Sequence, residues 1–305
     1  MELLWFFEGL RTPFWDTIFR YVTRLGEELT LIVIFCLLFW CINKHIAYVT
    51  GFSFFVSGLL VQGLKIIFRV PRPWVYDPSF PTVEGVTSEA TGYAFPSGHT
   101  QAAAAVLGSL GAQIKRKPIK FILFLLVFAV AFSRIYLGVH YLSDVLVSLA
   151  ISFALIFIAL KLITKEVVSI KRELIISCAV IGLVIVVLII AFILYQNGIS
   201  TESQIRDAIL SSGKAFGFAV AMFVERNFIR FSVKTNNIFL QIVKFVLGLG
   251  TVILVQEGLR VLGSGLVAVG LRYFLLVIYA AVVYPLIIKY VFAKNENAGK
   301  TSVMR

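Results

Sequence analysis

Nine apolar runs follow one another along this chain, each close to the roughly 20 residues that a helix needs to cross a bilayer. They cover residues 28–43, 46–68, 97–114, 119–137, 140–162, 173–195, 210–230, 237–261 and 266–291. Hydrophobic residues make up 59% of the 305 and charged residues only 14%, which is the composition of an integral membrane protein. We therefore expect an all-α fold, a polytopic transmembrane helical bundle of about nine spans.

The first 27 residues differ from the runs that follow, because aromatic side chains alternate there with charges such as Glu8, Arg11 and Asp16. This mixture is typical of an amphipathic helix at the membrane interface, and it lacks the uninterrupted apolar stretch of a cleavable signal peptide. Its aromatic residues could serve as a simple anchor or border the path of a lipid. We expect three regions: an interfacial segment 1–27, a membrane core 28–195 and an additional C-terminal transmembrane region 196–305.

Ionisable residues are costly between apolar runs and therefore indicate function. The segment 133–144, reading SRIYLGVHYLSD, holds an arginine, a histidine and an aspartate in such a position. His140 and Asp144 are four residues apart, so on a helix they share a face. The carboxylate can then hold the imidazole in one tautomer and raise its basicity, which prepares a nucleophile.

Two further polar clusters lie upstream, each at the edge of an apolar run. One comprises Lys65 and Arg72-Pro73, and the other is the sequence Pro96-Ser97-Gly98-His99. Lys65 and Arg72 end the second run, His99 opens the third, and the segment 133–144 joins the fourth to the fifth. The alternation of spans therefore predicts that all three clusters meet at one membrane face.

Lysines and arginines are concentrated in the loops on the other side, for example at Lys115, Arg116, Lys117 and Lys120. Positive loops stay in the cytoplasm, so we expect an extracytoplasmic site, with the N-terminus outside and the C-terminus inside. The net charge of +12 follows from these short loops, and no nucleic-acid partner is expected.

The patterns K-x6-R-P, P-S-G-H and S-R-x5-H-x3-D, in this order, resemble the signature of the type 2 phosphatidic acid phosphatase family, which shares its site with the vanadium haloperoxidases. The resemblance covers residues 25–165, roughly, and no signature position is substituted. It implies that His140 attacks phosphorus to form a phosphohistidine, that Asp144 orients His140, and that His99 protonates the leaving oxygen. It also implies a phosphate-binding set: Lys65, Arg72, Ser97, Gly98 and Arg134.

The chemistry of these residue types suits a phosphate. Lys65, Arg72 and Arg134 supply three cations, and a guanidinium can bind two oxygens at once. Ser97 and Gly98 open a helix, and helix N-termini bind anions. A single arginine of this kind could simply reach to the interface, but three beside two histidines favour a site.

The leading hypothesis is a membrane lipid phosphatase that acts on undecaprenyl diphosphate, phosphatidate, phosphatidylglycerophosphate or a sphingoid-base phosphate in a bacterial plasma membrane. A lipid phosphotransferase with the same site, and a lipid transporter that retains a phosphatase-like site, stay open as alternatives. Haloperoxidases are soluble, which disfavours that activity. No cofactor or metal is expected, because three histidines without clustered carboxylates make a poor metal site. The partners are then the lipid substrate and the bilayer.

The C-terminal spans lie outside the resemblance and are rich in glycine. Small residues allow helices to approach closely, so we expect a role in packing or in a homodimer. Glu225 with Arg226, or Glu257 with Arg260, could form intramembrane charge pairs. His45, beside Lys44 in a short turn, is interpreted as structural.

Overall fold

The computed structural model describes residues 1–83, 85–87, 90, 92–235 and 237–292. Within these residues every regular element is a helix, which confirms the all-α expectation. The first half forms α1 (Glu2–Glu8), α2 (Pro13–Arg24), α3 (Glu28–Leu37), α4 (Lys44–Phe68), α5 (Pro73–Tyr76), α6 (Gly98–Ala103), α7 (Ser109–Gln113), α8 (Lys117–Tyr136) and α9 (Leu142–Leu162). The second half forms α10 (Ile170–Gln196), α11 (Glu202–Val224), α12 (Ile238–Gly258), α13 (Leu266–Ile278) and α14 (Tyr284–Ile287).

Several helices continue without interruption into turns of another helix type. Such π-helical turns follow α3 (Leu38–Ile42), join α6 to α7 (Ala104–Gly108), follow α11 (Glu225–Ile229) and flank α14 (Tyr279–Val283 and Ile288–Phe292), and a 3-10 turn follows α12 (Leu259–Leu262). With these turns included, the helical segments coincide closely with the nine apolar runs of the sequence.

Judged by length and hydropathy, fewer than nine helices in the part of the chain that the structure describes could span a membrane. Seven helices of the described chain are long and apolar enough, or eight if α2 and the α3 segment, bent by 44°, count as one. The segment from α6 to α7 is not among them, because Gly98 to Gln113 is shorter than the roughly 20 residues that cross a bilayer. The expectation of nine full spans is therefore not confirmed.

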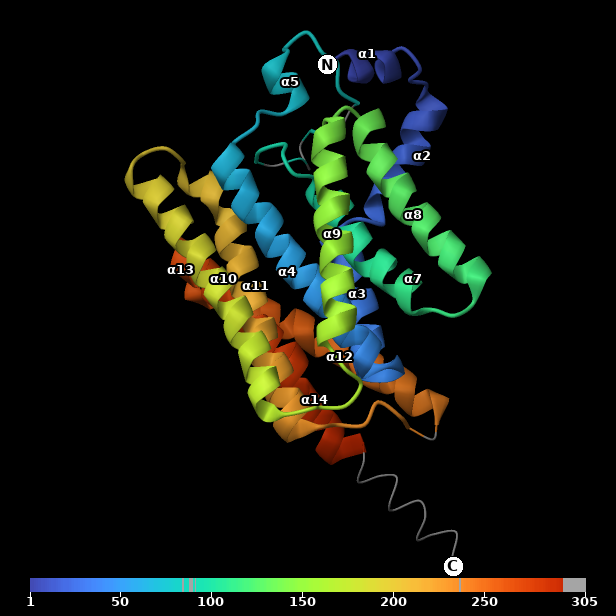
Figure 1. The fold of residues 1–305 in the computed structure, drawn as a ribbon, viewed down its shortest axis with the longest axis vertical. Coiled ribbons are helices and arrows are strands. Elements are labelled where there is room, and N and C mark those ends of the chain that lie inside the picture. The colour runs from blue at the N-terminus through green and yellow to red at the C-terminus, as the bar shows by residue number, and fades with distance from the viewer. Residues whose placement is uncertain (84, 88–89, 91, 236, 293–305) are drawn as a thin grey trace, which may run out of the picture.

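The N-terminal segment forms two helices where the sequence suggested one. Gly9 follows α1, and Pro13 occupies the first turn of α2, where the missing N–H of proline costs nothing. The hydroxyl of Thr12 caps α2 by accepting a hydrogen bond from the Trp15 N–H at 3.3 Å. Figure 1 shows α1 and α2 at one end of the bundle beside α8, while α14 lies at the other end.

Within the C-terminal region, α11 is the central helix and packs against α4, α10 and α13 (Figure 1). Glycines permit the closest of these contacts: a Cβ atom at Gly213 would collide with the carbonyl oxygen of Gly270, and one at Gly217 would lie 2.9 Å from that of Phe274. The expected packing role is confirmed inside one chain for Gly213 and Gly217. A Cβ atom would meet nothing within 4 Å at other glycines of this region, namely Gly250, Gly258, Gly263 and Gly265. The homodimer stays a prediction.

Two ion pairs, one partly and one almost fully buried, tie the π-helical turn after α11 to the rest of the bundle. Glu225 binds Lys44 at 2.8 Å, and Arg226 binds Glu173 at 3.0 Å. The suggested pairing of Glu225 with Arg226 is therefore wrong, because neighbours on a helix point in different directions. Glu257 and Arg260 do pair, at 2.8 Å, with both side chains more than half exposed.

Candidate active site

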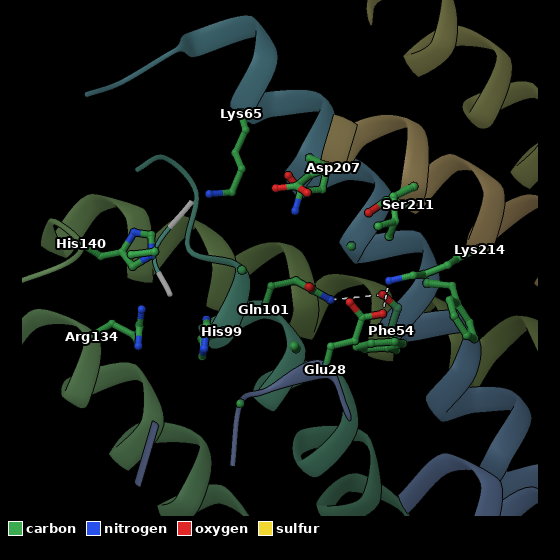
Figure 2. Close-up of a pocket in the computed structure, with 18 of the residues that line it drawn as sticks. Glu28, Phe54, Lys65, His99, Gln101, Arg134, His140, Asp207, Ser211 and Lys214 are labelled. Atoms are coloured by element: carbon green, nitrogen blue, oxygen red, sulfur yellow. Dashed lines mark hydrogen bonds and ion pairs between the residues drawn. The ribbon is translucent and has the colours of Figure 1, made fainter. Parts of the chain in front are cut away.

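The three sequence clusters converge on one cavity of about 260 Å³, as the alternation of spans predicted. Figure 2 shows Lys65, His99, Arg134 and His140 around one half of this cavity. Six of the eight predicted site residues line it, namely Lys65, Arg72, Gly98, His99, Arg134 and His140. The other two, Ser97 and Asp144, lie fully buried directly behind them.

His140 lies in the loop between α8 and α9 and is almost completely buried. The loop turns at Gly138, whose φ of +72° is readily available only to glycine. Nδ1 of His140 lies 3.1 Å from Oδ2 of Asp144, in the first turn of α9. The same oxygen accepts a hydrogen bond from the Tyr141 N–H at 2.9 Å, so the carboxylate is held by the start of the helix.

The second ring nitrogen of His140 identifies the tautomer. Nε2 lies 2.9 Å from Nη1 of Arg72, and a guanidinium can only donate hydrogen bonds. Nε2 must therefore accept, and the ring proton resides on Nδ1, facing Asp144. A neutral imidazole with its lone pair on Nε2, at the cavity, is the form that can act as a nucleophile.

The surroundings of His140 also favour the neutral form. Burial, followed by the positive charges of Arg72, Lys65 and Arg134, lowers the pKa of His140 well below its ordinary value of 6.5. His140 lies between the membrane-spanning helices and is neutral at physiological pH by this argument. The nucleophilic form then needs no general base to remove a proton first.

The three predicted phosphate-binding cations are buried and held by backbone or hydroxyl oxygens. Lys65 donates to the Tyr93 carbonyl at 2.6 Å, and Arg72 donates to the carbonyls of Gly92 and Val139 at 3.1 and 2.9 Å. Nη1 of Arg134 donates to Oγ1 of Thr23 at 2.5 Å. These contacts hold the three cationic side chains in place at the cavity wall.

The start of α6 forms another part of the wall, where Gly98 and His99 line the cavity. Ser97 has a different set of contacts: its N–H donates to the Asp144 carbonyl at 3.1 Å, and its hydroxyl caps α6 through the Thr100 N–H at 3.4 Å. Ser97 thus joins α6 to α9. The backbone N–H of Ser97 already donates to Asp144 and is not available to a phosphate. Direct phosphate binding by Ser97 stays a prediction.

Several residues of the cavity were not identified from the sequence. Gly26 of the N-terminal segment lines the cavity, and a Cβ atom there would lie 2.8 Å from the His99 carbonyl oxygen. Thr23 of the same segment does not line the cavity but accepts the hydrogen bond from Arg134. The remaining polar residues come from α3, α4, α6 and α11, namely Glu28, Gln62, Gln101, Asp207, Ser211 and Lys214. The available signals were three charges: Lys214 inside the seventh apolar run, Asp207 just before it and Glu28 at the start of the first run.

Fold and cavity together define an integral membrane protein of helices with a buried, cationic, histidine-containing pocket. The chain belongs to the PAP2 superfamily, because the family model described as "PAP2 superfamily" matches residues 46–167. Residues 209–295 match the description "PAP2 superfamily phosphatase, transmembrane extension". All the sequence clusters lie within the first match, and most of α11 to α14 lies within the second.

Three named relatives agree with this family. The chain is 29% identical to a dihydrosphingosine 1-phosphate phosphatase of Saccharomyces cerevisiae over 48% of its own length. It is 32% identical to an undecaprenyl-diphosphatase of Bacillus subtilis over 38% of its length, and 30% identical to phosphatidylglycerophosphatase B of Escherichia coli over 49%. The matches span 38%, 56% and 74% of these proteins, respectively.

Proposed function

We propose that the protein is a membrane lipid phosphatase that hydrolyses a lipid phosphate or diphosphate through a phosphohistidine at His140. One observation carries this proposal: Nε2 of His140, which accepts a hydrogen bond from Arg72, lies at a cavity that Lys65, Arg72 and Arg134 line, and Asp144 contacts the other ring nitrogen. The names of the three relatives, each a phosphatase or diphosphatase of a lipid, support the same reaction.

The reaction has two steps. Nε2 of His140 attacks phosphorus, the N–P bond forms, and the bond from phosphorus to the lipid oxygen breaks. Burial and the cations lower the pKa of His99 to about 3, so His99 takes up a proton as the negatively charged phosphate binds. It donates this proton to the lipid oxygen and becomes the neutral base. It then takes a proton from the water that attacks the phosphohistidine, which releases inorganic phosphate and restores His140.

The cations lower the barrier to both steps. Negative charge spreads over the non-bridging oxygens as phosphorus is attacked, and fixed donors at those oxygens stabilise it. Arg72 contacts Nε2 of His140 directly, so a phosphate oxygen bound to Arg72 brings phosphorus next to the nucleophile. Lys65 and Arg134 complete the set from α4 and α8.

Phosphate release by the purified protein in the presence of EDTA tests this function. The panel comprises undecaprenyl diphosphate, phosphatidate, phosphatidylglycerophosphate and a sphingoid-base phosphate, with His140→Ala as the control. We expect release from at least one lipid, and its loss in the variant. No release from any of them by folded protein would contradict the proposal and favour transport, whereas capture of labelled phosphate by an alcohol in place of water would favour a phosphotransferase.

We also propose that the site opens to the extracytoplasmic side, because lysines and arginines are concentrated in the loops away from it. Thr87, exposed in the loop before α6, offers a test. In intact cells Thr87→Cys should react with a membrane-impermeant thiol reagent above the background of the parent, which has three cysteines of its own. Protection until the cells are lysed would reverse the orientation.

A further inference from the structure

The cavity does not end at the histidines but continues to α11. Asp207, Ser211 and Lys214 follow one another along the face of this helix that lines the cavity, three or four residues apart. In Figure 2 they lie opposite His140, beyond Lys65 and Gln101. Ser211 and Lys214 belong to the transmembrane extension, and Asp207 lies two positions before the matched residues 209–295. A region outside the phosphatase core therefore forms one wall of the proposed active site.

The two halves of the cavity differ in charge. The half around His140 holds Lys65, Arg72 and Arg134. In the other half, Lys214 forms an ion pair with Glu28, and its ammonium also lies 4.8 Å from the Tyr273 ring centroid. Lys214 is thereby neutralised before any ligand binds.

Asp207 is the carboxylate left over in this second half. It makes no hydrogen bond or ion pair with the parts of the chain that the structure describes. Its side chain is partly buried on the same side of the cavity as Lys65 (Figure 2). Lys65 and Arg72 attract this negative charge at a distance, and neither binds the carboxylate directly. A positive group of the ligand can therefore bind the oxygens of Asp207.

We propose that Asp207 binds an ammonium group of the substrate, and that the substrate is a lipid phosphate monoester with an amine close to the phosphate, as in a sphingoid-base phosphate. This inference rests on the proposed function and specifies its substrate. The phosphate lies among Lys65, Arg72 and Arg134, the ammonium faces Asp207, and Phe54, Phe55 and Leu210 receive the first part of the chain. A diphosphate would instead place a second anion against Asp207.

A pair of lipids that differ in one charge tests this assignment. Sphinganine 1-phosphate has a free ammonium group, and its N-acetyl derivative has a neutral amide at the same carbon. In the parent protein we expect kcat/KM to be about 10-fold higher or more for the amine, the value of one charge-assisted hydrogen bond. In Asp207→Asn this ratio should fall toward one. The ratio cancels any loss of activity that affects both lipids.

Glu202→Gln is the matched control, since Glu202 lies on the same helix and outside this cavity, where it pairs with Arg206 at 3.9 Å. Glu202→Gln should keep the preference of the parent. Equal rates with both lipids in the parent, or an unchanged preference in Asp207→Asn, would overturn the assignment of Asp207 while His140-dependent release still supports a phosphatase.

A binding measurement separates the two proposals if no turnover is seen. The thermal unfolding temperature of His140→Ala, in detergent, is measured with each lipid in excess, because a ligand that binds the folded state raises it. A larger rise in unfolding temperature with the amine lipid than with its N-acetyl derivative, which disappears when Asp207→Asn is added, supports the ammonium site even if no turnover occurs. Equal protection by both lipids would overturn it.

Discussion

The guanidinium of Arg72 lies 2.9 Å from Nε2 of His140, the ring nitrogen opposite the one that faces Asp144. The imidazole is thus held at both nitrogens, by a residue that can only donate and by a carboxylate that accepts. Both contacts require the same tautomer. In the proposed reaction, Arg72 transfers its hydrogen bond from Nε2 to an oxygen of the entering phosphate, which exposes the nitrogen that is proposed to attack phosphorus.

The role of Asp144 leads to the first prediction. In Asp144→Asn, the amide oxygen in the place of Oδ2 can still accept from both the Tyr141 N–H and Nδ1–H of His140, because one oxygen makes both contacts. What the variant loses is the negative charge of the carboxylate, which raises the basicity of the imidazole and stabilises the positive ring that forms when Nε2 bonds to phosphorus. We expect kcat to fall about 10²–10⁴-fold. Steady-state phosphate release measures it, and a variant with parental kcat and unfolding temperature would contradict this role.

The pH dependence follows from the low pKa of His140. The imidazole of His140 attacks only when neutral, so its pKa sets the acid limb and activity is lost as the pH falls through it. The need for a protonated His99 limits activity on the basic side. Because burial and three cations lower the pKa of His140, the acid limb of kcat/KM should lie well below pH 6.5. Arg72→Gln removes one of those charges, and the limb should then move to higher pH.

The pH profiles of kcat/KM for the parent and Arg72→Gln check this expectation. Arg260→Gln is the charge-matched control, since Arg260 is exposed and forms its ion pair with Glu257 outside the cavity. Its profile should overlay that of the parent. An acid limb at the ordinary value in the parent, or a shift in the opposite direction in Arg72→Gln, would disprove the electrostatic explanation.

The contact between Arg134 and Thr23 makes the N-terminal segment part of the site. Thr23→Val keeps the shape of the side chain but removes the hydroxyl that accepts from Arg134. A hydrogen bond to a charged group contributes about 1.5–3 kcal/mol, so we expect kcat/KM to fall roughly 10-fold or more. Thr23→Ser should restore most of it, which a purely steric role would not.

Thr17→Val, on the same helix, is the control for this experiment. Its hydroxyl donates to the Pro13 carbonyl at 2.7 Å and has no contact with the cavity. Kinetics of the three variants with one lipid decide the question. Equal losses in Thr17→Val and Thr23→Val would point to a general effect on α2 instead.

The ion pair between Glu173 and Arg226 predicts a change in stability. Two contacts of 3.0 Å join these side chains, both almost fully buried. Glu173→Gln leaves the guanidinium buried without its counter-charge, which costs about 3–5 kcal/mol. The unfolding temperature in detergent should drop markedly. Glu257→Gln breaks an exposed ion pair, which contributes about 0–1 kcal/mol, so it should leave the unfolding temperature nearly unchanged.

The positions of the helices could be predicted because each span must be apolar over its whole length. Residues 237–261, for example, became α12 and its 3-10 turn. The convergence of the candidate site residues could be predicted for a related reason: the histidines and cations stand out where ionisable residues are costly. Their meeting followed from the alternation of spans.

Contacts between distant parts of the sequence could not be predicted. Lys44 and Glu225 are 181 positions apart, and no spacing links them. Likewise, nothing in the sequence indicates that α11 turns Asp207 toward the cavity, because this depends on how α11 packs against α4. Gly9 and Pro13 mark the break between α1 and α2 in the sequence. We did not predict this break, because the amphipathic pattern suggested one continuous helix.

The most direct test of the central claim is to detect phosphate on His140. The protein is mixed with a radiolabelled lipid phosphate that it hydrolyses and is quenched in alkali, in which phosphohistidine survives. We predict label on the parent protein, labile to acid and located in the peptide that contains His140, and none on His140→Ala. Equal labelling of both proteins, or continued phosphate release by His140→Ala, would contradict a nucleophilic role for this residue.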